Sequence, residues 1–418
     1  MKPRFLLLAA TLLCPALLMS EDSVQDKMRP FTRESYWVKQ EERPAITRAL
    51  LVQALEKSRS FYLNNQKDDG SFNYIVNLET GRVNNKKNNP VRQAGALWGL
   101  ACLNRDRFNE PTRQAVVDGI KFFSQNIQKL PTGRKCVVFP QNDQISTGMV
   151  ALYCLSLIDY LRGEERHMDA ETSQMYRQLL DIHLDYLKSM ELPDGSWAKV
   201  FNVAGNITEP EGSPYYDGEA LLAYCKAARY LGHTELLPRI NEALPKLIAK
   251  YTVELWSNPS VPDDASKGFY QWCCMSLNEY VMAGWDPHRQ LAIDTSLAYS
   301  YWLIHHEKVA SRTGNTAYAV EGLISSWNIA TMTGNRDAQK KLEQVIFDIM
   351  GRLMILQLDG PLMSHNPVLS KLVEVKRPKE SLVGGITSSL YDTTVRIDTQ
   401  QHQTHAMLLM LDAFFTEK

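Results

Sequence analysis

Three titratable side chains near residue 400 have the spacing of neighbours on a helix. Asp398, His402 and His405 are separated by four and then three residues, so a helix would place them on one face. An aspartate that accepts a hydrogen bond from an imidazole fixes its tautomer and raises its basicity, which suits a general acid or base. We therefore expect Asp398 and His402 to be catalytic. The alternative is that Asp398 caps the helix and the histidines are polar residues of a buried helix.

The same face could also hold zinc, since aspartate and histidine are both zinc ligands. No cysteine lies on that face and no fourth ligand is evident. The sequence also lacks a GxSxG nucleophile motif, a phosphate-binding Walker loop, an HExxH zinc motif and a dinucleotide fingerprint. We expect no metal and no other cofactor.

A second group of candidates opens the apolar run at residues 213–231. Tyr215 and Tyr216 offer rings that stack on sugars and hydroxyls that donate hydrogen bonds. Glu219 lies just inside the run, where partial burial raises a carboxyl pKa. The simpler interpretation is that Asp217 and Glu219 stabilise the positive end of the helix dipole.

Glu219 and Asp398 are the carboxyl pair that we predict for glycoside hydrolysis. That reaction needs two carboxyl groups across the scissile bond, one protonated and one ionised. Asp263 and Asp264, at the start of another apolar run, are reserve candidates.

Two arginines stand at the starts of two apolar runs. Arg92 and Arg396 could together bind a carboxylate in bidentate fashion, as a uronic-acid substrate would require. The alternative is that each pairs with a structural carboxylate. The residues predicted to contact a substrate are Asn89, Arg92, Gln93, Tyr215, Tyr216, Tyr270, Arg396, Gln401 and His405.

These candidates all lie in or beside the polar starts of six similar segments, each a polar cluster followed by an apolar run. The segments begin near residues 88, 144, 213, 266, 311 and 396. Between them lie more charged segments with apolar residues at helical spacing, at 47–64, 111–128, 170–190, 234–252, 287–305 and 336–356. Helices apolar on all sides are buried, whereas amphipathic helices cover a core. Six of each predict an all-α (α/α)6 toroid of six helical hairpins, with the polar starts at one end.

The turns after two of the amphipathic helices agree with this repeat. They read Asp69-Gly70-Ser71-Phe72 and Asp194-Gly195-Ser196-Trp197, and Asp-Gly is a strong turn signal. Residues 357–395 interrupt the rhythm. We expect a long loop or β-ribbon there across the mouth of the barrel, with a strand-like stretch at 370–377.

The six polar-headed helices and the two Asp-Gly turns resemble those of the six-hairpin toroid enzymes. That group includes six-hairpin glycosidases, sugar 2-epimerases, uronate C5-epimerases and toroidal lyases, with terpenoid-cyclase toroids as a sister group. The resemblance covers residues 44–415 and is one of architecture, since no catalytic signature of a single family is matched. It implies a central funnel with a substrate bound at one end. The acidic cluster of the cationic terpene cyclases is missing.

The N-terminus predicts export. Residues 1–20 have a basic start, an apolar stretch and a polar exit, which indicates a signal peptide, and residues 21–43 read as a polar leader before a single domain at 44–418. The six cysteines after Cys14 are an even number, which in an exported chain suggests disulfides. Most of them lie inside apolar helical runs, so burial in the core as free cysteines is the preferred interpretation and disulfides are the alternative. The 46 basic and 47 acidic residues give no field that would attract nucleic acid.

We therefore predict a secreted or periplasmic carbohydrate-active enzyme, with a glycoside hydrolase as the leading interpretation. Its partner would be an oligo- or polysaccharide, with a uronic-acid unit if the arginines bind a carboxylate. It would have no nucleic-acid partner and no membrane span after signal removal. A uronate epimerase or lyase, a non-catalytic glycan-binding or scaffold toroid, and a terpenoid-cyclase-like protein are the alternatives.

Overall fold

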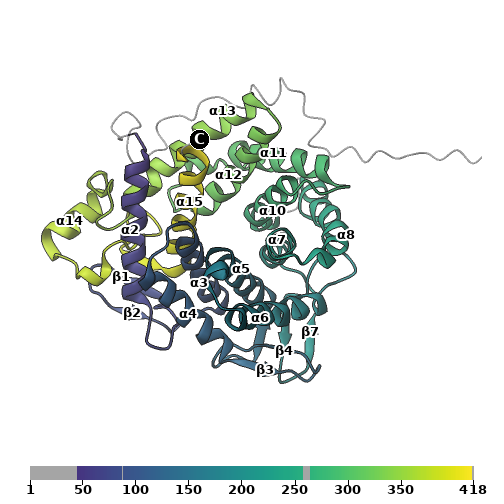
Figure 1. Ribbon diagram of the computed structural model, residues 1–418. Coiled ribbons are helices and arrows are strands. Elements are labelled where there is room, and N and C mark those ends of the chain that lie inside the picture. The colour runs from purple at the N-terminus through teal and green to yellow at the C-terminus, as the bar shows by residue number, and fades with distance from the viewer. Residues whose placement is uncertain (1–44, 87, 258–263, 417–418) are drawn as a thin grey trace, which may run out of the picture.

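Six helices form a closed inner ring in the computed structural model, which describes residues 45–86, 88–257 and 264–416. Each contacts the next, and the last contacts the first. Figure 1 views the ring along its axis, with these helices around its centre. The inner helices are α3 (Pro90–Asp106), α5 (Thr147–Glu164), α7 (Pro214–Leu231), α10 (Asp264–Met282), α12 (Ala317–Met332) and α15 (Ile397–Phe415). The predicted signal peptide, the leader and the reserve candidate Asp263 lie outside the described residues.

A second set of helices surrounds this ring, one before each inner helix in the chain (Figure 1). Alternation of outer and inner helices makes all the inner helices run in the same direction. The predicted (α/α)6 toroid is confirmed. The outer helices are α2 (Arg48–Asn65), α4 (Glu110–Ser124), α6 (Ala170–Ser189), α8 (Leu237–Ile248), α11 (Arg289–His305) and α13 (Arg336–Leu353).

The fourth outer element is less regular than predicted. Instead of one helix over 234–252, it consists of a 3-10 turn (Thr234–Leu236), α8, a π-helical turn (Ala249–Val253) and the short α9 (Glu254–Trp256). Pro245 lies inside α8 and cannot donate a backbone hydrogen bond. Further 3-10 turns span Glu165–His167 and Val309–Ser311.

Glycines allow the inner helices to pack closely. A Cβ atom on Gly148 of α5 would lie 2.3 Å from the ring of Tyr216 on α7, and one on Gly218 of α7 would lie 2.4 Å from Trp272 on α10. Any larger residue would push the helices apart. These two glycines, near the starts of α5 and α7, therefore set the spacing of these inner helices and bring their polar starts together.

Short strands lie in the loops between helices, where few strand signals are present in the amino-acid sequence. They form the sheets β2-β1-β8, β3-β4 and β5-β6-β7. Strand β8 pairs antiparallel with β1, Val76 opposite Val395, so the sixth hairpin is fastened to the first. The strands are β1 (Ile75–Asn77), β2 (Val83–Asn84), β3 (Ile127–Lys129), β4 (Lys135–Val137), β5 (Gln144–Ser146), β6 (Val200–Asn202), β7 (Ile207–Glu209) and β8 (Thr394–Arg396).

The two Asp-Gly turns have the predicted form and anchor the next inner helix. Gly70 and Gly195 both have positive φ, at 89° and 83°. After the first turn, the backbone N–H of Phe72 donates to Oε1 of Gln93 on α3 at 2.8 Å. After the second, that of Trp197 donates to Oδ1 of Asp217 on α7 at 2.9 Å. Gln93 and Asp217 are both fourth in their helices, so the repeat extends to individual hydrogen bonds.

The irregular segment before the last helix differs in part from its prediction. Residues 370–377 are not strand-like, because helix α14 (Pro367–Lys376) occupies most of them. Pro367 begins this helix and Asn366 caps it, accepting from the N–H groups of Val368 and Leu369. In Figure 1, α14 lies outside α2 at the edge of the toroid. Three 3-10 turns flank it, at Met354–Leu356, Met363–His365 and Glu380–Leu382.

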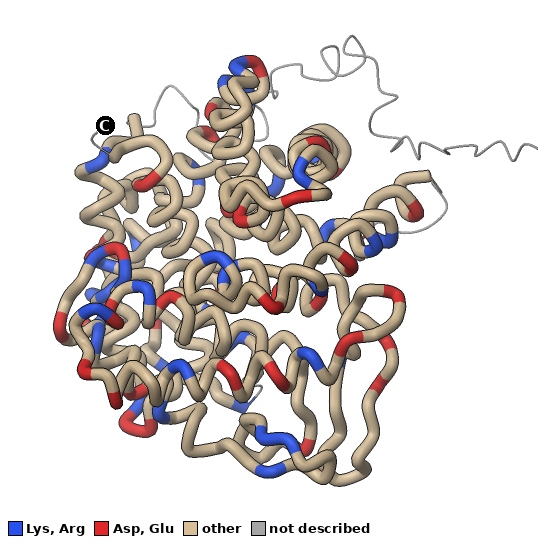
Figure 2. The backbone as a smooth tube through the Cα atoms, turned by 45° about the vertical axis from the view of Figure 1, so that its right-hand side comes forward, with Lys and Arg blue, Asp and Glu red and all other residues tan. Residues whose placement is uncertain are grey.

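The core is continuous around the toroid, and charge is spread over the surface. All six predicted buried cysteines are free and buried, which confirms that expectation; they are Cys102, Cys136, Cys154, Cys225, Cys273 and Cys274. Figure 2 shows acidic and basic residues interspersed along the chain. Among the described helices, none has the length and apolarity needed to cross a bilayer.

Candidate active site

A cavity of about 530 Å³ opens at the N-terminal end of the inner helices. This volume is within the range of small-molecule sites. All six inner helices or the residues just before them contribute to its lining. Nine of the twelve predicted site residues line it: Asn89, Arg92, Tyr215, Tyr216, Glu219, Arg396, Asp398, Gln401 and His402.

Asp398 lies between the two predicted arginines. Its Oδ1 accepts from Nε of Arg396 at 2.6 Å, and its Oδ2 lies 2.9 Å from Nε of Arg92. Burial opposes ionisation, but the hydrogen bond and charge of Arg396, with the charge of Arg92, hold the pKa of Asp398 below its ordinary value. The arginines thus pair with a carboxylate of the chain, the alternative noted from the sequence. The hydrogen bond expected between Asp398 and His402 is not found among the described residues.

His402 is instead held by Glu321, a residue of α12. Nδ1 of His402 lies 3.0 Å from Oε2 of Glu321, and Nδ1 of His405 lies 2.6 Å from Oε1. Nε2 of Gln271 donates to the same carboxylate at 2.5 Å. Because an ionised carboxylate only accepts, Nδ1 of His402 must carry a proton. Nε2 is then the ring nitrogen left to act on a ligand in the cavity that His402 lines.

The two charges of this pair stabilise each other. Burial lowers the pKa of His402, but the charge and hydrogen bond of Glu321 outweigh it, so the pKa lies above its ordinary value. Burial likewise opposes ionisation of Glu321, but His402 and His405 outweigh it and lower that pKa. The result is an imidazole with a fixed tautomer and raised basicity.

Sequence reasoning missed Glu321, although a signal was present. It is the single charged residue within residues 317–332 and is completely buried. A charge inside so apolar a helix needs a partner. The sequence does not reveal that the partners come from α15, because that pairing depends on how the ring closes.

Glu219 is in the opposite situation from Asp398. It is only 3% exposed, and its Oε2 has no hydrogen-bond partner among the described residues. Burial raises the pKa of Glu219 well above its ordinary value. Burial therefore favours the protonated form of this carboxyl group, and that form can donate a proton or a hydrogen bond to a ligand.

Gln401 and Trp272 complete the inner part of the cavity. Gln401 is 2% exposed, and its Nε2 has no partner among the described residues. The ring of Trp272 lies 6.2 Å from that of His402. An unsatisfied amide, a protonated carboxyl group and an aromatic ring suit a hydroxylated ligand with one apolar face.

The remaining three predicted residues lie outside the cavity lining. Gln93 is 1% exposed because both ends of its amide bind the backbone of Phe72. Tyr270 faces away from the cavity, donating to the carbonyl of Ala319, so its neighbours on α10, Lys267, Gln271 and Trp272, line the site instead. His405 lies behind Glu321.

The other lining residues follow from the same helix starts. Asn315, Tyr318 and Thr399 belong to the polar starts before or in α12 and α15. In the part of the chain that the structure describes, no group of three or more histidine, cysteine or acidic residues could hold a metal ion.

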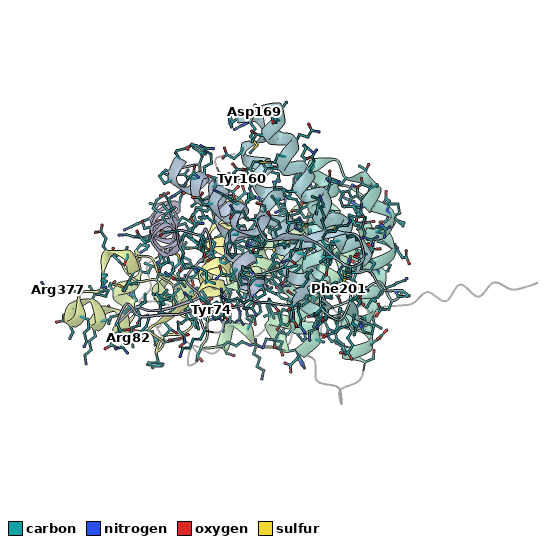
Figure 3. The ribbon with its side chains drawn as sticks, turned by 90° about the horizontal axis from the view of Figure 1, so that it is seen from below. Tyr74, Arg82, Tyr160, Asp169, Phe201 and Arg377 are labelled. Carbon is teal, nitrogen blue, oxygen red and sulfur yellow. The ribbon has the colours of Figure 1, made fainter. Side chains whose placement is uncertain are left out.

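A buried ion cluster lies at the opposite, C-terminal end of the inner helices. Asp159 of α5 is completely buried and accepts from Nζ of Lys226 and NH1 of Arg105, both at 2.5 Å, and from NH1 of Arg162 at 2.6 Å. Burial opposes its ionisation, but these three cations hold the pKa of Asp159 well below its ordinary value. Figure 3 shows the two ends: Tyr160, next to Asp159, lies toward one, and Tyr74 toward the other.

Trp98 connects the two ends. Its Nε1 donates to Oδ2 of Asp159 at 2.8 Å, while its ring lies 4.6 Å from that of His405 and 5.7 Å from that of Trp272. The cavity therefore has a floor of packed aromatic rings, and below it a charged layer.

No protein-family model and no curated protein sequence matches the chain. Solved structures do. A D-mannose isomerase matches with a TM-score of 0.62 and 12% identity, over 88% of this chain and 99% of that one. A cellobiose 2-epimerase from Bacillus thermoamylovorans matches with a TM-score of 0.57 and 13% identity, over 88% and 100% of the two chains. A family 76 glycoside hydrolase (mannosidase) from Bacteroides thetaiotaomicron matches with a TM-score of 0.53 and 12% identity, over 86% and 98%.

These likenesses confirm the predicted resemblance at the level of the fold. The chain shares the (α/α)6 toroid of sugar isomerases, sugar epimerases and glycoside hydrolases. At such low identity they carry no residue assignments, so any chemistry must be argued from the cavity itself.

Proposed function

We propose that this protein is a carbohydrate-active enzyme that moves a proton on a saccharide bound in the cavity, as an epimerase or isomerase does. The observation that carries the proposal is the buried carboxylate of Glu321, which lies 3.0 Å from Nδ1 of His402. It leaves Nε2 as the base, in a cavity that also contains a protonated Glu219. The folds of a mannose isomerase and a cellobiose 2-epimerase support a sugar as the substrate.

In the proposed reaction His402 removes a proton from the carbon beside a sugar carbonyl. Glu219 donates a hydrogen bond or a proton to the carbonyl oxygen, on which negative charge develops. The buried Glu321 stabilises the imidazolium that forms, and Trp272 supports one face of the sugar. For the isomer, His402 returns the proton to the neighbouring carbon, and the hydroxyl on the first carbon gives its proton to Glu219 as it becomes the new carbonyl. For the epimer, the intermediate first turns its other face toward His402, which returns the proton to the same carbon while Glu219 takes back its own.

Glycoside hydrolysis, predicted from the sequence, is the second candidate. It is supported by the opposite pKa shifts of Glu219 and Asp398, since a hydrolase needs one protonated and one ionised carboxyl group. Against it, both oxygens of Asp398 are already paired with arginines, which weakens this carboxylate as a base.

The non-enzymatic and cyclase alternatives fit the cavity less well. A scaffold toroid would have each funnel carboxyl group neutralised by a structural partner, yet Glu219 Oε2 has none among the described residues. A terpenoid-cyclase-like protein would have an apolar, aromatic cavity, whereas Arg92, Arg396 and Asp398 line this one. Export of the enzyme remains part of the proposal, on the strength of residues 1–20.

Proton NMR in D₂O distinguishes the two reactions. The protein is incubated with a panel of neutral and acidic mono- and oligosaccharides. Proton transfer is expected to bring deuterium into the carbon beside the carbonyl, and His402→Gln should slow this by about 10²–10⁴-fold, the usual contribution of a general base. New reducing ends without deuterium would favour hydrolysis. If no sugar in the panel changes, the enzyme proposal fails.

A further inference from the structure

The cavity has more fixed positive than negative charge. Arg92, Arg396 and Lys267 line it, while Asp398 is the one lining carboxyl group whose pKa is lowered. Burial favours the uncharged form of Glu219. Glu321 lies behind His402 and His405, so even when its carboxylate is counted with Asp398, three cations face two carboxylates. The interior is thus positive, although the whole chain has a formal net charge of −1.

Among the cations that line the cavity, Lys267 is the one without an ion pair in the part of the chain that the structure describes. It is half-buried and lines the cavity, and it has no ion-pair partner among the described residues. Asp398, in contrast, occupies Nε of both arginines. An ammonium held in a concave, partly desolvated site attracts an anion more strongly than one on an open surface does.

The position of Lys267 on α10 indicates how a bound ligand would be oriented in the cavity. Gln271 follows it by one helical turn on the same face, and Gln271 contacts Glu321, which holds His402. Lys267 is therefore one turn nearer to the start of α10, and so nearer to the mouth of the cavity. An anionic group at Lys267 would leave the rest of the ligand pointing toward His402.

We propose that the substrate is an acidic sugar whose anionic group binds Lys267, with Arg396, which also lines the cavity, contributing to the field. The terminal guanidinium nitrogens of Arg396 remain available, because its bond to Asp398 uses Nε, and the side chain is 42% exposed. A carboxylate, a sulfate and a phosphate share this chemistry. This proposal rests on the proposed function only in treating the acidic sugar as a substrate. The preference for binding an acidic sugar does not depend on whether the sugar is turned over.

Isothermal titration calorimetry on the full chain tests this preference. The probes are D-glucuronate, D-galacturonate, glucose 6-sulfate and glucose 6-phosphate, each compared with its neutral parent sugar. At least one acidic sugar should bind about tenfold or more tightly than its parent, and the advantage should shrink as salt rises. The acidic probe that binds most tightly identifies the anionic group. If no acidic probe binds more tightly than its parent, the proposal is overturned.

Variants at Lys267 then assign the preference to this residue. Lys267→Met keeps the length of the side chain without its charge and should remove most of the advantage of the acidic sugar while leaving the affinity for the neutral one unchanged. Lys267→Arg should restore it. Lys340→Met, an exposed lysine on α13, is the matched control and should have no effect. Equal losses for both kinds of sugar in Lys267→Met would show that Lys267 only supports the fold.

The outcomes separate this proposal from the proposed function. Tight binding of an acidic sugar without deuterium exchange or hydrolysis would retain the anion preference and reject the enzyme. Deuterium exchange on neutral sugars with no preference for acidic ones would retain the enzyme and reject the anion preference.

Discussion

Each end of the inner helices contains a buried carboxyl group, and the two carboxyl groups are paired in opposite ways. At the ion-cluster end, Asp159 is surrounded by three cations and accepts a further hydrogen bond from Trp98. At the open end, Glu219 Oε2 and Gln401 Nε2 have no partner among the described residues. Because both ends belong to the same helices, the difference comes from side chains and not from the backbone. Paired groups favour the folded state, whereas unpaired groups cost stability and are available to a ligand.

The largest effect is expected from breaking the pair that orients the base. In Glu321→Gln the buried amide can bind either tautomer of His402, so the ring loses its fixed orientation. Turnover should fall by about 10⁴-fold, the loss typical when the partner that fixes a catalytic tautomer is removed. Steady-state kinetics on the substrate found by NMR measures it. Activity within threefold of wild type would remove Glu321 and His402 from the mechanism.

A substitution in the ion cluster should lower the stability of the protein and leave its activity unchanged. Asp159→Asn leaves Lys226, Arg105 and Arg162 without their shared carboxylate, and should lower the free energy of unfolding by about 3–5 kcal/mol. Urea titration measures this loss, and kcat/KM of the folded fraction should be unchanged.

Glu110→Gln is the control for that measurement. It removes one partner of an ion pair with Arg113 in which the glutamate is 59% exposed, so its effect on the free energy of unfolding should be much smaller than that of Asp159→Asn. Equal losses of stability in Asp159→Asn and Glu110→Gln would contradict the assigned role of the ion cluster.

Glu219→Gln should separate activity from stability at the open end. Turnover should fall by about 100-fold, because the amide cannot donate a proton. Stability at pH 7 should be equal to or higher than that of wild type. A carboxyl whose folded pKa is raised binds more protons in the folded than in the unfolded state, so wild type loses stability as pH rises above about 4.5, and the amide does not. Thermal melts at pH 4 and pH 7 measure the difference; a less stable variant at pH 7 would mean that Glu219 has a structural partner.

The smallest effect is the titration of His402 itself. Since Glu321 raises its pKa, the neutral base should form only above the ordinary value of about pH 6.5, and the rate should increase through that range. The ring-proton NMR signal of His402 measures the pKa directly. In Glu321→Gln the pKa should fall by about one unit or more, worth ~1.4 kcal/mol per unit. An unchanged pKa would show that the carboxylate does not act on this ring.

The architecture could be predicted because it follows from local patterns. Apolar runs alternating with amphipathic segments predict inner and outer helices, and helices of one direction must have their polar starts at one end. The outer helix near residue 250 was less predictable, because Pro245 and a π-helical turn break its regular spacing. Residues 370–377 alternate like a strand, but Pro367 and Asn366 begin a helix before them.

The partners within the site could not be predicted, because they depend on contacts between distant segments. His402 and Glu321 are on different helices, 81 positions apart in the chain. Helix rotation also matters: a small difference in the direction of α10 turns Tyr270 into the core and Lys267 and Trp272 toward the cavity. Gln93 looked like a ligand-binding side chain, and its role in holding Phe72 becomes visible only when the turn and the helix are placed together.

The pairing of β1 with β8 has a consequence for synthesis of the protein. Asp398, Gln401 and His402 all belong to α15, which follows directly after β8. While the ribosome is still translating the earlier hairpins, the ring is an open arc without these side chains and without the strand that closes it. The nascent chain can therefore fold helix by helix, but it gains a complete binding site in one step, when the final helix docks between α12 and α3.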